Sequence, residues 1–163
     1  AIETPEGEVD EAPSEVAVTV RIADDLDISR GDVLCAAGEP PSVTQEFEAT
    51  VCWMSERSEL RAGAMLRVKH ATRTARAMVV DLLSRMDVTS LDAEAGVDAL
   101  RLNEIGRVTI RTSTPLVCDD YVQNRTTGSF ILVDEATNNT VAAGMIGAPR
   151  FGDALLAKAA TAP

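Results

Sequence analysis

Residues that could carry out catalysis are sparse in this sequence. A serine or cysteine nucleophile needs a base beside it, and His70 is the only histidine. The surrounding stretch LRVKHATRTARA is typical of a β-hairpin rather than of the strained turn that presents a nucleophile. No GxxxxGKS or GxxxxGKT phosphate loop, GxGxxG turn or HExxH metal motif occurs. We therefore expect this chain to have no catalytic centre of its own.

Residues that could bind a metal are also dispersed along the chain. The sequence contains three cysteines, which are Cys35, Cys52 and Cys118. They form no CxxC pair and none lies near His70 in the sequence, whereas a metal site needs clustered ligands. We expect reduced thiols, mostly buried, in a cytoplasmic protein. The acidic pairs at 24–25 and 119–120 could hold a cation, although such pairs are more typical of solvated turns.

The overall charge restricts the possible partners. The chain has 26 acidic against 15 basic residues and a formal net charge of -11. Nucleic-acid binding depends on Lys and Arg neutralising phosphates, so we expect neither nucleic acid nor an anionic membrane surface as partner. No apolar run approaches the roughly 18 residues of a membrane span, and no secretory signal is present. The first residue is Ala1, which suggests a processed or excised piece of a longer protein.

One cluster of residues reverses this charge locally. It consists of Arg67, Lys69, His70, Arg73 and Arg76. If residues 65–70 form a strand, Arg67 and Lys69 share one face of it and His70 lies on the other. The cluster could dock an acidic partner surface, or its cations could be solvated and balance nearby acids.

A second candidate is the stretch DDYVQNRTTGSF. Tyr121, Asn124, Arg125 and two threonines bring many hydrogen-bonding groups into one turn. Such a loop either braces itself or contacts a partner. Trp53 lies on an alternating stretch, and we expect it in the core rather than on a ligand-binding surface.

The elements that must position these residues are short strands. In residues 46–53 apolar and polar side chains alternate with the two-residue period of a half-buried strand. The same pattern predicts further strands at 16–22, 33–37, 65–70, 74–82, 105–111, 129–133 and 140–146. We expect a loop or frayed lead-in over 1–15, a loop with at most one helical turn over 91–100, and a flexible or short helical tail over 149–163.

This succession of elements predicts an all-β fold. Many short strands with turn residues between them are typical of an antiparallel sandwich or barrel. Long amphipathic helices are missing, which argues against a Rossmann fold or a helical bundle. Aromatic residues make up 3% of the chain, so the core must be built from Val, Ile, Leu, Met and Ala.

Several phrases resemble one family in their order and wording. AVTVRIADDLDISRGDVL resembles the closing strands of the second domain of translation-factor GTPases, and FEATVCWM, LRAGAMLRVKHATRTARA and LNEIGRVTIRTSTPL follow in the order of their third domain. The wording is most similar to the large, GTPase subunit of bacterial sulfate adenylyltransferase, above all in YVQNRTTGSFILVDEATNNTVAAGM. The resemblance covers about residues 8–147. It implies an antiparallel Greek-key barrel of the third-domain type at 43–148, preceded at 1–42 by the closing strands of a second-domain barrel.

The resemblance also implies a function. In that family a GTP-binding domain precedes the two barrels, and GTP hydrolysis drives adenylyl transfer from ATP to sulfate on a small subunit. This chain lacks the phosphate loop, the DxxG switch and the NKxD motif, so GTP and Mg would belong to a missing G domain. The implied role is a non-catalytic region, without a cofactor, that couples the G domain to the small subunit. We expect Arg73, Arg76, Asn124 and Arg125 at the interfaces with these partners.

Two questions stay open at this point. A truncated second barrel would leave an open strand edge, so residues 1–42 should either pair with the third-domain barrel or associate with another chain. The rival to the coupling role is a stand-alone small β-barrel that binds a ligand, or an enzyme that uses Asp119, Asp120 and Tyr121 with His70. Titration with ATP, GTP and sulfate separates the two, because the coupling region should bind none of them.

Overall fold

The computed structural model describes residues 1–38 and 40–147, and every regular element within these residues is a strand. The strands are β1 (Ile2–Thr4), β2 (Gly7–Val9), β3 (Thr19–Val20), β4 (Ser42–Trp53), β5 (Met65–His70), β6 (Arg73–Met86), β7 (Ala93–Ala95), β8 (Ile105–Cys118), β9 (Ser129–Val133) and β10 (Thr140–Ile146). The all-β class expected from the sequence is confirmed.

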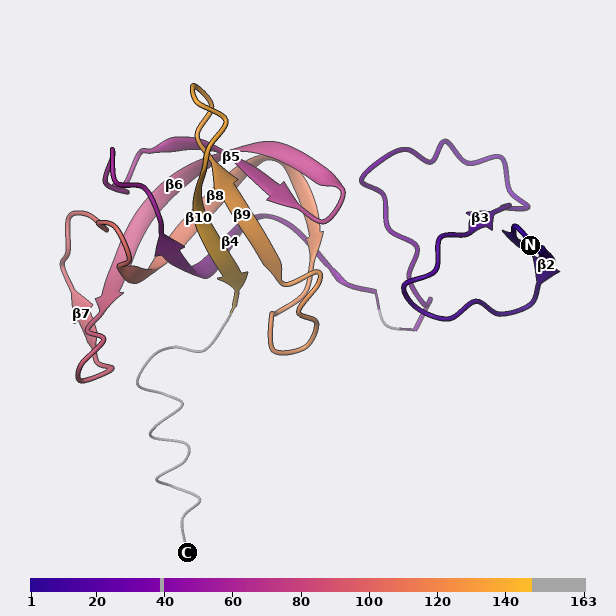
Figure 1. Ribbon diagram of the computed structural model, residues 1–163, viewed down its shortest axis with the longest axis horizontal. Coiled ribbons are helices and arrows are strands. Elements are labelled where there is room, and N and C mark those ends of the chain that lie inside the picture. The colour runs from indigo at the N-terminus through magenta and orange to yellow at the C-terminus, as the bar shows by residue number, and fades with distance from the viewer. Residues whose placement is uncertain (39, 148–163) are drawn as a thin grey trace, which may run out of the picture.

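Strands β4 to β10 form a barrel (Figure 1). Their order is β5-β9-β10-β4-β8-β6-β7, and β5 also pairs with β6, which closes the sheet on itself. Every pairing is antiparallel, and β7 is a short addition on the side of β6. In the barrel β5 lies beside β6, and β6 lies beside β8. The other neighbour of β8 is β4, which a long connection separates from β5 in the sequence. This arrangement is a Greek key, as the family resemblance implied.

The barrel interior is filled from alternate strand positions. On β4 the side chains of Phe47, Ala49, Val51 and Trp53 are all buried, as their alternation predicted. Trp53 is 2% exposed and its Nε1 donates a hydrogen bond to the Ser58 carbonyl at 2.6 Å, so it is a core residue. The largest fully buried side chains are aliphatic: Leu60, Leu100, Ile110, Leu116, Leu132, Val51, Val68, Val79 and Val108.

Two barrel strands are longer than the sequence pattern indicates. β6 and β8 span Arg73–Met86 and Ile105–Cys118, whereas alternation predicts only 74–82 and 105–111. On β6 the register of pairing shifts between Val79 and Asp81 and again between Leu82 and Ser84. On β8 the register of pairing with β4 shifts between Arg111 and Leu116. Each shift marks a β-bulge or a similar irregularity, which places extra residues on one strand and interrupts the alternation beyond it. The periodic signal therefore stops before the strand does.

Residues 1–38 differ most from the sequence prediction. The expected loop over 1–15 is wrong, because β1 and β2 form a hairpin there and β3 pairs with the other side of β1. The turn between β1 and β2 ends at Gly7, whose φ of 131° suits glycine. Of the strand expected over 16–22 only β3 forms, with Val20 44% exposed rather than half-buried. No strand forms over 33–37.

The segment over 91–100 also needs a correction. It contains β7, which pairs with Ser84–Met86 at the end of β6, and it contains no helical turn. Leu100, at its end, forms an isolated bridge with Leu60, and both side chains are fully buried. The tail predicted over 149–163 lies outside the described residues. Among the described residues, no helix has the length and apolarity needed to cross a membrane.

Candidate interaction surfaces

The basic cluster lies on the hairpin formed by β5 and β6. The register places Arg67 opposite Arg76 and His70 opposite Arg73. Arg67 and Lys69 face outward, whereas His70 faces the barrel interior and is 3% exposed. The two faces of β5 are therefore as the sequence predicted, and the cluster does not form one continuous basic surface.

His70 supports a neighbouring loop rather than forming a catalytic pair. Its Nε2 lies 2.7 Å from the Thr127 carbonyl and must carry the proton, because a carbonyl oxygen only accepts. The Thr127 hydroxyl donates to the Asp119 carboxylate at 2.5 Å. Asp120 and the Tyr121 amide bond to backbone groups of the same loop and of β10. The side chains of His70, Asp119 and Asp120, three of the four in the rival enzyme hypothesis, are thus engaged in bracing the loop over 119–128.

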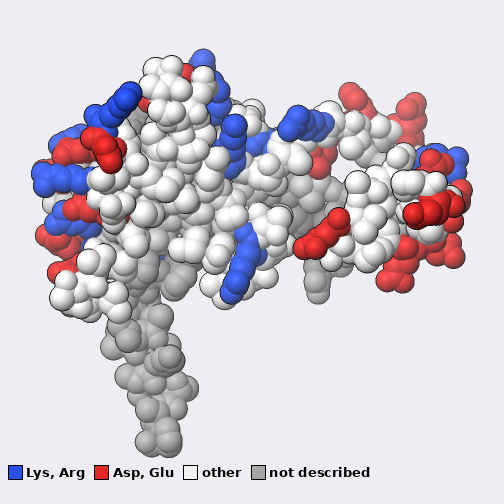
Figure 2. Space-filling model, in the orientation of Figure 1, with Lys and Arg blue, Asp and Glu red and all other residues white. Residues whose placement is uncertain are grey.

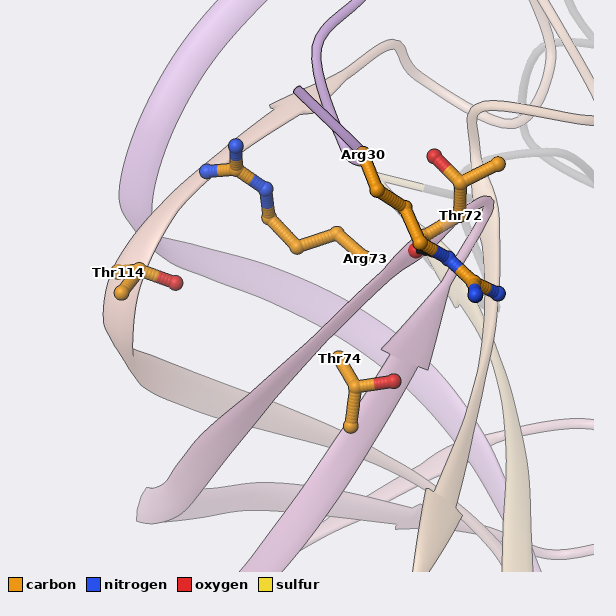
Figure 3. A pocket seen from close by; sticks show the side chains of 5 residues that line it. All are labelled: Arg30, Thr72, Arg73, Thr74 and Thr114. Atoms are coloured by element: carbon orange, nitrogen blue, oxygen red, sulfur yellow. Dashed lines mark hydrogen bonds between the residues drawn. The ribbon is translucent and has the colours of Figure 1, made fainter.

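Arg73 borders a shallow hollow of about 440 Å³ beside the hairpin turn (Figure 3). The hollow is lined by Arg30, Thr72, Arg73, Thr74 and Thr114, and the guanidinium groups of Arg30 and Arg73 point away from each other. Arg73 donates to the Pro115 carbonyl at 3.0 Å and lies 3.3 Å from the Asp32 carboxylate. Arg73 therefore joins β6, β8 and the segment over 30–32. Because its side chain is only 29% exposed, it has little surface left for a partner.

Gly31 permits this contact between the N-terminal segment and the barrel. Its φ is 103°, and a Cβ built on it would lie 2.7 Å from the Arg73 Nε. Arg30, on the other side of Gly31, donates to the Thr72 carbonyl at 3.3 Å. Residues 30–32 therefore contact the barrel, while the sheet of β1, β2 and β3 pairs only within itself among the described residues.

Replacing Gly31 by alanine is expected to release this contact. The substitution combines a strained backbone conformation with a clash against Arg73, and the local opening free energy should fall by about 1 kcal/mol or more. Hydrogen exchange should then be faster at 30–33 and 72–74, while the urea midpoint of the barrel changes little. Gly38→Ala is the matched control, because a Cβ at Gly38 meets nothing within 4 Å. Equal exchange in both variants would show that Gly31 does not constrain the contact.

The other three residues expected at interfaces lie in different settings. Arg76 has a side chain that is 73% exposed and that pairs with Glu135 at 3.4 Å. Asn124 braces its own loop, since its Oδ1 accepts hydrogen bonds from the amides of Thr126 and Thr127 at 3.0 and 3.4 Å. Arg125 is exposed on the same loop. The structure brings Asn124 and Arg125 together on one loop and Arg73 and Arg76 on one strand, and among the described residues no hydrogen bond or ion pair joins the two pairs.

A groove that the sequence prediction missed lies on the outside of the barrel. It has a volume of about 1080 Å³, crosses β4, β10 and β9, and is bordered by the loop over 121–126. Its lining includes Thr50, Cys52, Ile131, Met145, Lys69 and Arg125, and we call it the outer groove. Figure 2 shows the face over β9 and β10 as largely uncharged, in contrast to the acidic residues gathered around β1 to β3.

The outer groove had a signal in the sequence. Cys52, Ile131 and Met145 occupy the outward positions of their strands, where a solvated face would carry polar residues. Lys69 and Arg125 are exposed at its border, and neither side chain has an ion pair or hydrogen bond to any described residue.

The cysteines and acids do not combine into a reactive site. The described residues contain no group of three or more His, Cys, Asp and Glu side chains that could hold a metal. All three thiols are free, but only Cys118 is buried, so the expectation of mostly buried thiols is wrong. Burial, and then the nearby Asp119 carboxylate, raise the pKa of the Cys118 thiol, which keeps it protonated and unreactive at neutral pH.

Comparison with known sequences extends over most of the chain. A bifunctional enzyme CysN/CysC of Mycobacterium tuberculosis is 52% identical over 146 residues, which are 90% of this chain and 24% of that protein. Sulfate adenylyltransferase subunit 1 of Aeromonas hydrophila is 44% identical over 89% of this chain and 30% of its own length. The resemblance to the large subunits of bacterial sulfate adenylyltransferases is thereby confirmed. The chain spans about a quarter to a third of the length of these relatives.

Solved structures and a family profile agree on the type of barrel. Two structures of sup35, one complexed with GDP and one with GMPPNP, superpose with TM-scores of 0.70 and 0.72 at 21% and 22% identity. Each match covers 90% of this chain and 36% of the other, and at this identity it shows the fold alone. The profile described as GTP-eEF1A C-terminal domain-like matches residues 46–147, which contain the closed barrel apart from the first residues of β4. The chain therefore belongs to the GTP-eEF1A C-terminal domain-like family.

Proposed function

We propose that this chain is the non-catalytic β-barrel region of a GTP-dependent sulfate adenylyltransferase large subunit. In this role it couples a G domain to the small subunit that forms adenylyl sulfate from ATP and sulfate. The observation that carries the proposal is the 52% identity over 146 residues to a bifunctional CysN/CysC enzyme. GTP and Mg would bind to the G domain of the parent protein, and the complex would work in the cytoplasm.

The physical properties of the chain support a coupling role. His70 and Asp119, which could act as base or acid, are engaged in bracing a loop, and the closed barrel has a continuous core of buried apolar side chains. Coupling requires that the barrel make different contacts in the GTP and GDP states, because equal contacts in both states shift no equilibrium. A rigid barrel suits this task, since it can transmit a change at one face to a partner on another.

The proposal predicts a defined binding pattern for the purified chain. Calorimetric titration with ATP, GTP or sulfate should show no saturable binding, whereas titration with the small adenylyltransferase subunit of the same organism should. The reason is that nucleotide and sulfate sites belong to other parts of the assembly. Saturable binding of any of the three small molecules would favour the rival, a stand-alone β-barrel that binds a ligand. Failure to bind the small subunit would contradict the coupling role.

A further inference from the structure

We propose that the outer groove is the docking site for the small subunit, and that it receives a segment with apolar side chains and at least one carboxylate. This inference rests on the proposed function. It goes further by assigning a surface and the chemistry of the segment that binds there. Three independent features of the groove carry it: its apolar floor, a buried hydroxyl, and two cations, the hydroxyl and the cations having no partner among the described residues.

The floor of the groove is apolar although it lies outside the barrel. Cys52 on β4, Met145 on β10 and Ile131 on β9 lie on neighbouring strands and point away from the core. A single exposed apolar residue needs no explanation, but a contiguous apolar surface on a hollow marks an interaction site. The volume of about 1080 Å³ is sufficient for several side chains of a partner segment.

Thr50 adds a polar group that nothing in the described chain satisfies. The residue lines the groove and is 2% exposed, and its Oγ1 has no hydrogen-bond partner among the described residues. Buried hydroxyl groups in proteins almost always have a partner, so an unsatisfied one requires an explanation. A backbone or side-chain group of a docked segment would satisfy Oγ1 and would gain specificity from it.

Lys69 and Arg125 indicate the charge of the occupant. They lie on β5 and on the loop over 121–126, so two separate elements bring them to the groove. Most of the other described cations are paired, for example Arg107 with Glu48, Arg111 with Glu46, and Arg85 with Glu94 and Glu104. Two cations that have no ion pair with a described residue and lie beside an apolar floor, in a chain of net charge -11, select a segment that brings a carboxylate.

The test measures the affinity of the full chain for the purified small subunit by calorimetry. The double variant Lys69→Glu with Arg125→Glu should bind about 100-fold more weakly, since two attractive contacts become repulsive. Thr50→Val should bind about tenfold more weakly, while its urea midpoint stays the same or rises, because the unsatisfied hydroxyl is removed. The matched control is Arg57→Glu, an exposed arginine outside the groove whose side chain forms no ion pair with a described residue. It should bind like the wild type.

Three other outcomes would overturn the inference, and each shows which part of it is wrong. If the wild type binds the small subunit and the groove variants bind equally well, the coupling role stands and the docking site lies elsewhere. If the wild type does not bind the small subunit at all, both the coupling role and the assigned occupant are wrong. If the chain dimerises in analytical ultracentrifugation and the groove variants abolish the dimer, the occupant is a second copy of the chain.

Discussion

Trp53→Ala is expected to lower the free energy of unfolding by about 3–5 kcal/mol, as large-to-small substitutions of buried aromatic residues do. Trp53 is the last residue of β4, and its side chain lies in the core and is 2% exposed. The substitution leaves a cavity and also removes the donor to the Ser58 carbonyl, which lies 2.6 Å from the indole nitrogen. Urea denaturation followed by circular dichroism measures the effect.

Two further variants separate packing from the hydrogen bond. Trp53→Phe keeps most of the aromatic volume and loses the indole donor, so its cost should be only about 1–2 kcal/mol. Met54→Ala changes the next residue, which is 41% exposed, and should cost less than about 0.5 kcal/mol. If Trp53→Ala were as mild as Met54→Ala, the core assignment of the β4 end would be wrong.

The sequence predicted the barrel well where one face of a strand is buried. On β4, the alternation of Phe47, Ala49, Val51 and Trp53 follows directly from the pleat, because successive side chains point to opposite faces. The same rule placed Arg67 and Lys69 on one face of β5 and His70 on the opposite face. Alternation did not show the full length of the two longest strands. Register shifts near Asp81 and Ser84 interrupt it on β6, and a shift between Arg111 and Leu116 interrupts it on β8.

The prediction was weakest in the N-terminal region, for a physical reason. Alternation over 16–22 indicates that one face is to be buried, but it does not say against what. In this structure most of these side chains stay exposed, as do others in the same region: Val16, Val20, Ile22, Leu26, Ile28, Val33 and Leu34. These exposed apolar residues support the proposal that 1–42 is the closing part of a second barrel, whose other strands would cover them.

The candidate surfaces could be predicted only in part. Asn124 and Arg125 stand next to each other in the sequence, but the composition of their loop left self-bracing and partner contact both open. The structure shows that Asn124 braces the loop. The outer groove brings together Thr50, Lys69 and Met145, which are far apart in the sequence. A single sequence shows that each outward position is apolar or basic, but only the strand order shows that these positions are neighbours.

Gly128→Ala is expected to lower both the stability of the chain and its affinity for the small subunit. A Cβ on Gly128 would lie 2.4 Å from the Tyr121 Cα and 2.6 Å from its nitrogen. These are backbone atoms, so no change of rotamer relieves the clash and the loop over 119–128 must move. Such overpacking costs about 2–3 kcal/mol. Because the loop carries Arg125, its displacement should also weaken binding at the outer groove.

The size of the effect follows from the bonds that hold this loop on the barrel. The Gly128 amide donates to the Asn124 carbonyl at 2.8 Å, and the Gly128 carbonyl accepts from the Ile146 amide at 2.7 Å. The Tyr121 amide donates in turn to the Ile146 carbonyl at 2.9 Å, so a shift at Gly128 disturbs all three bonds. Gly38→Ala is again the control, because it meets no atom within 4 Å and should leave both measurements unchanged. A Gly128→Ala chain with the urea midpoint and the affinity of the wild type would show that the loop yields without cost and does not position Arg125.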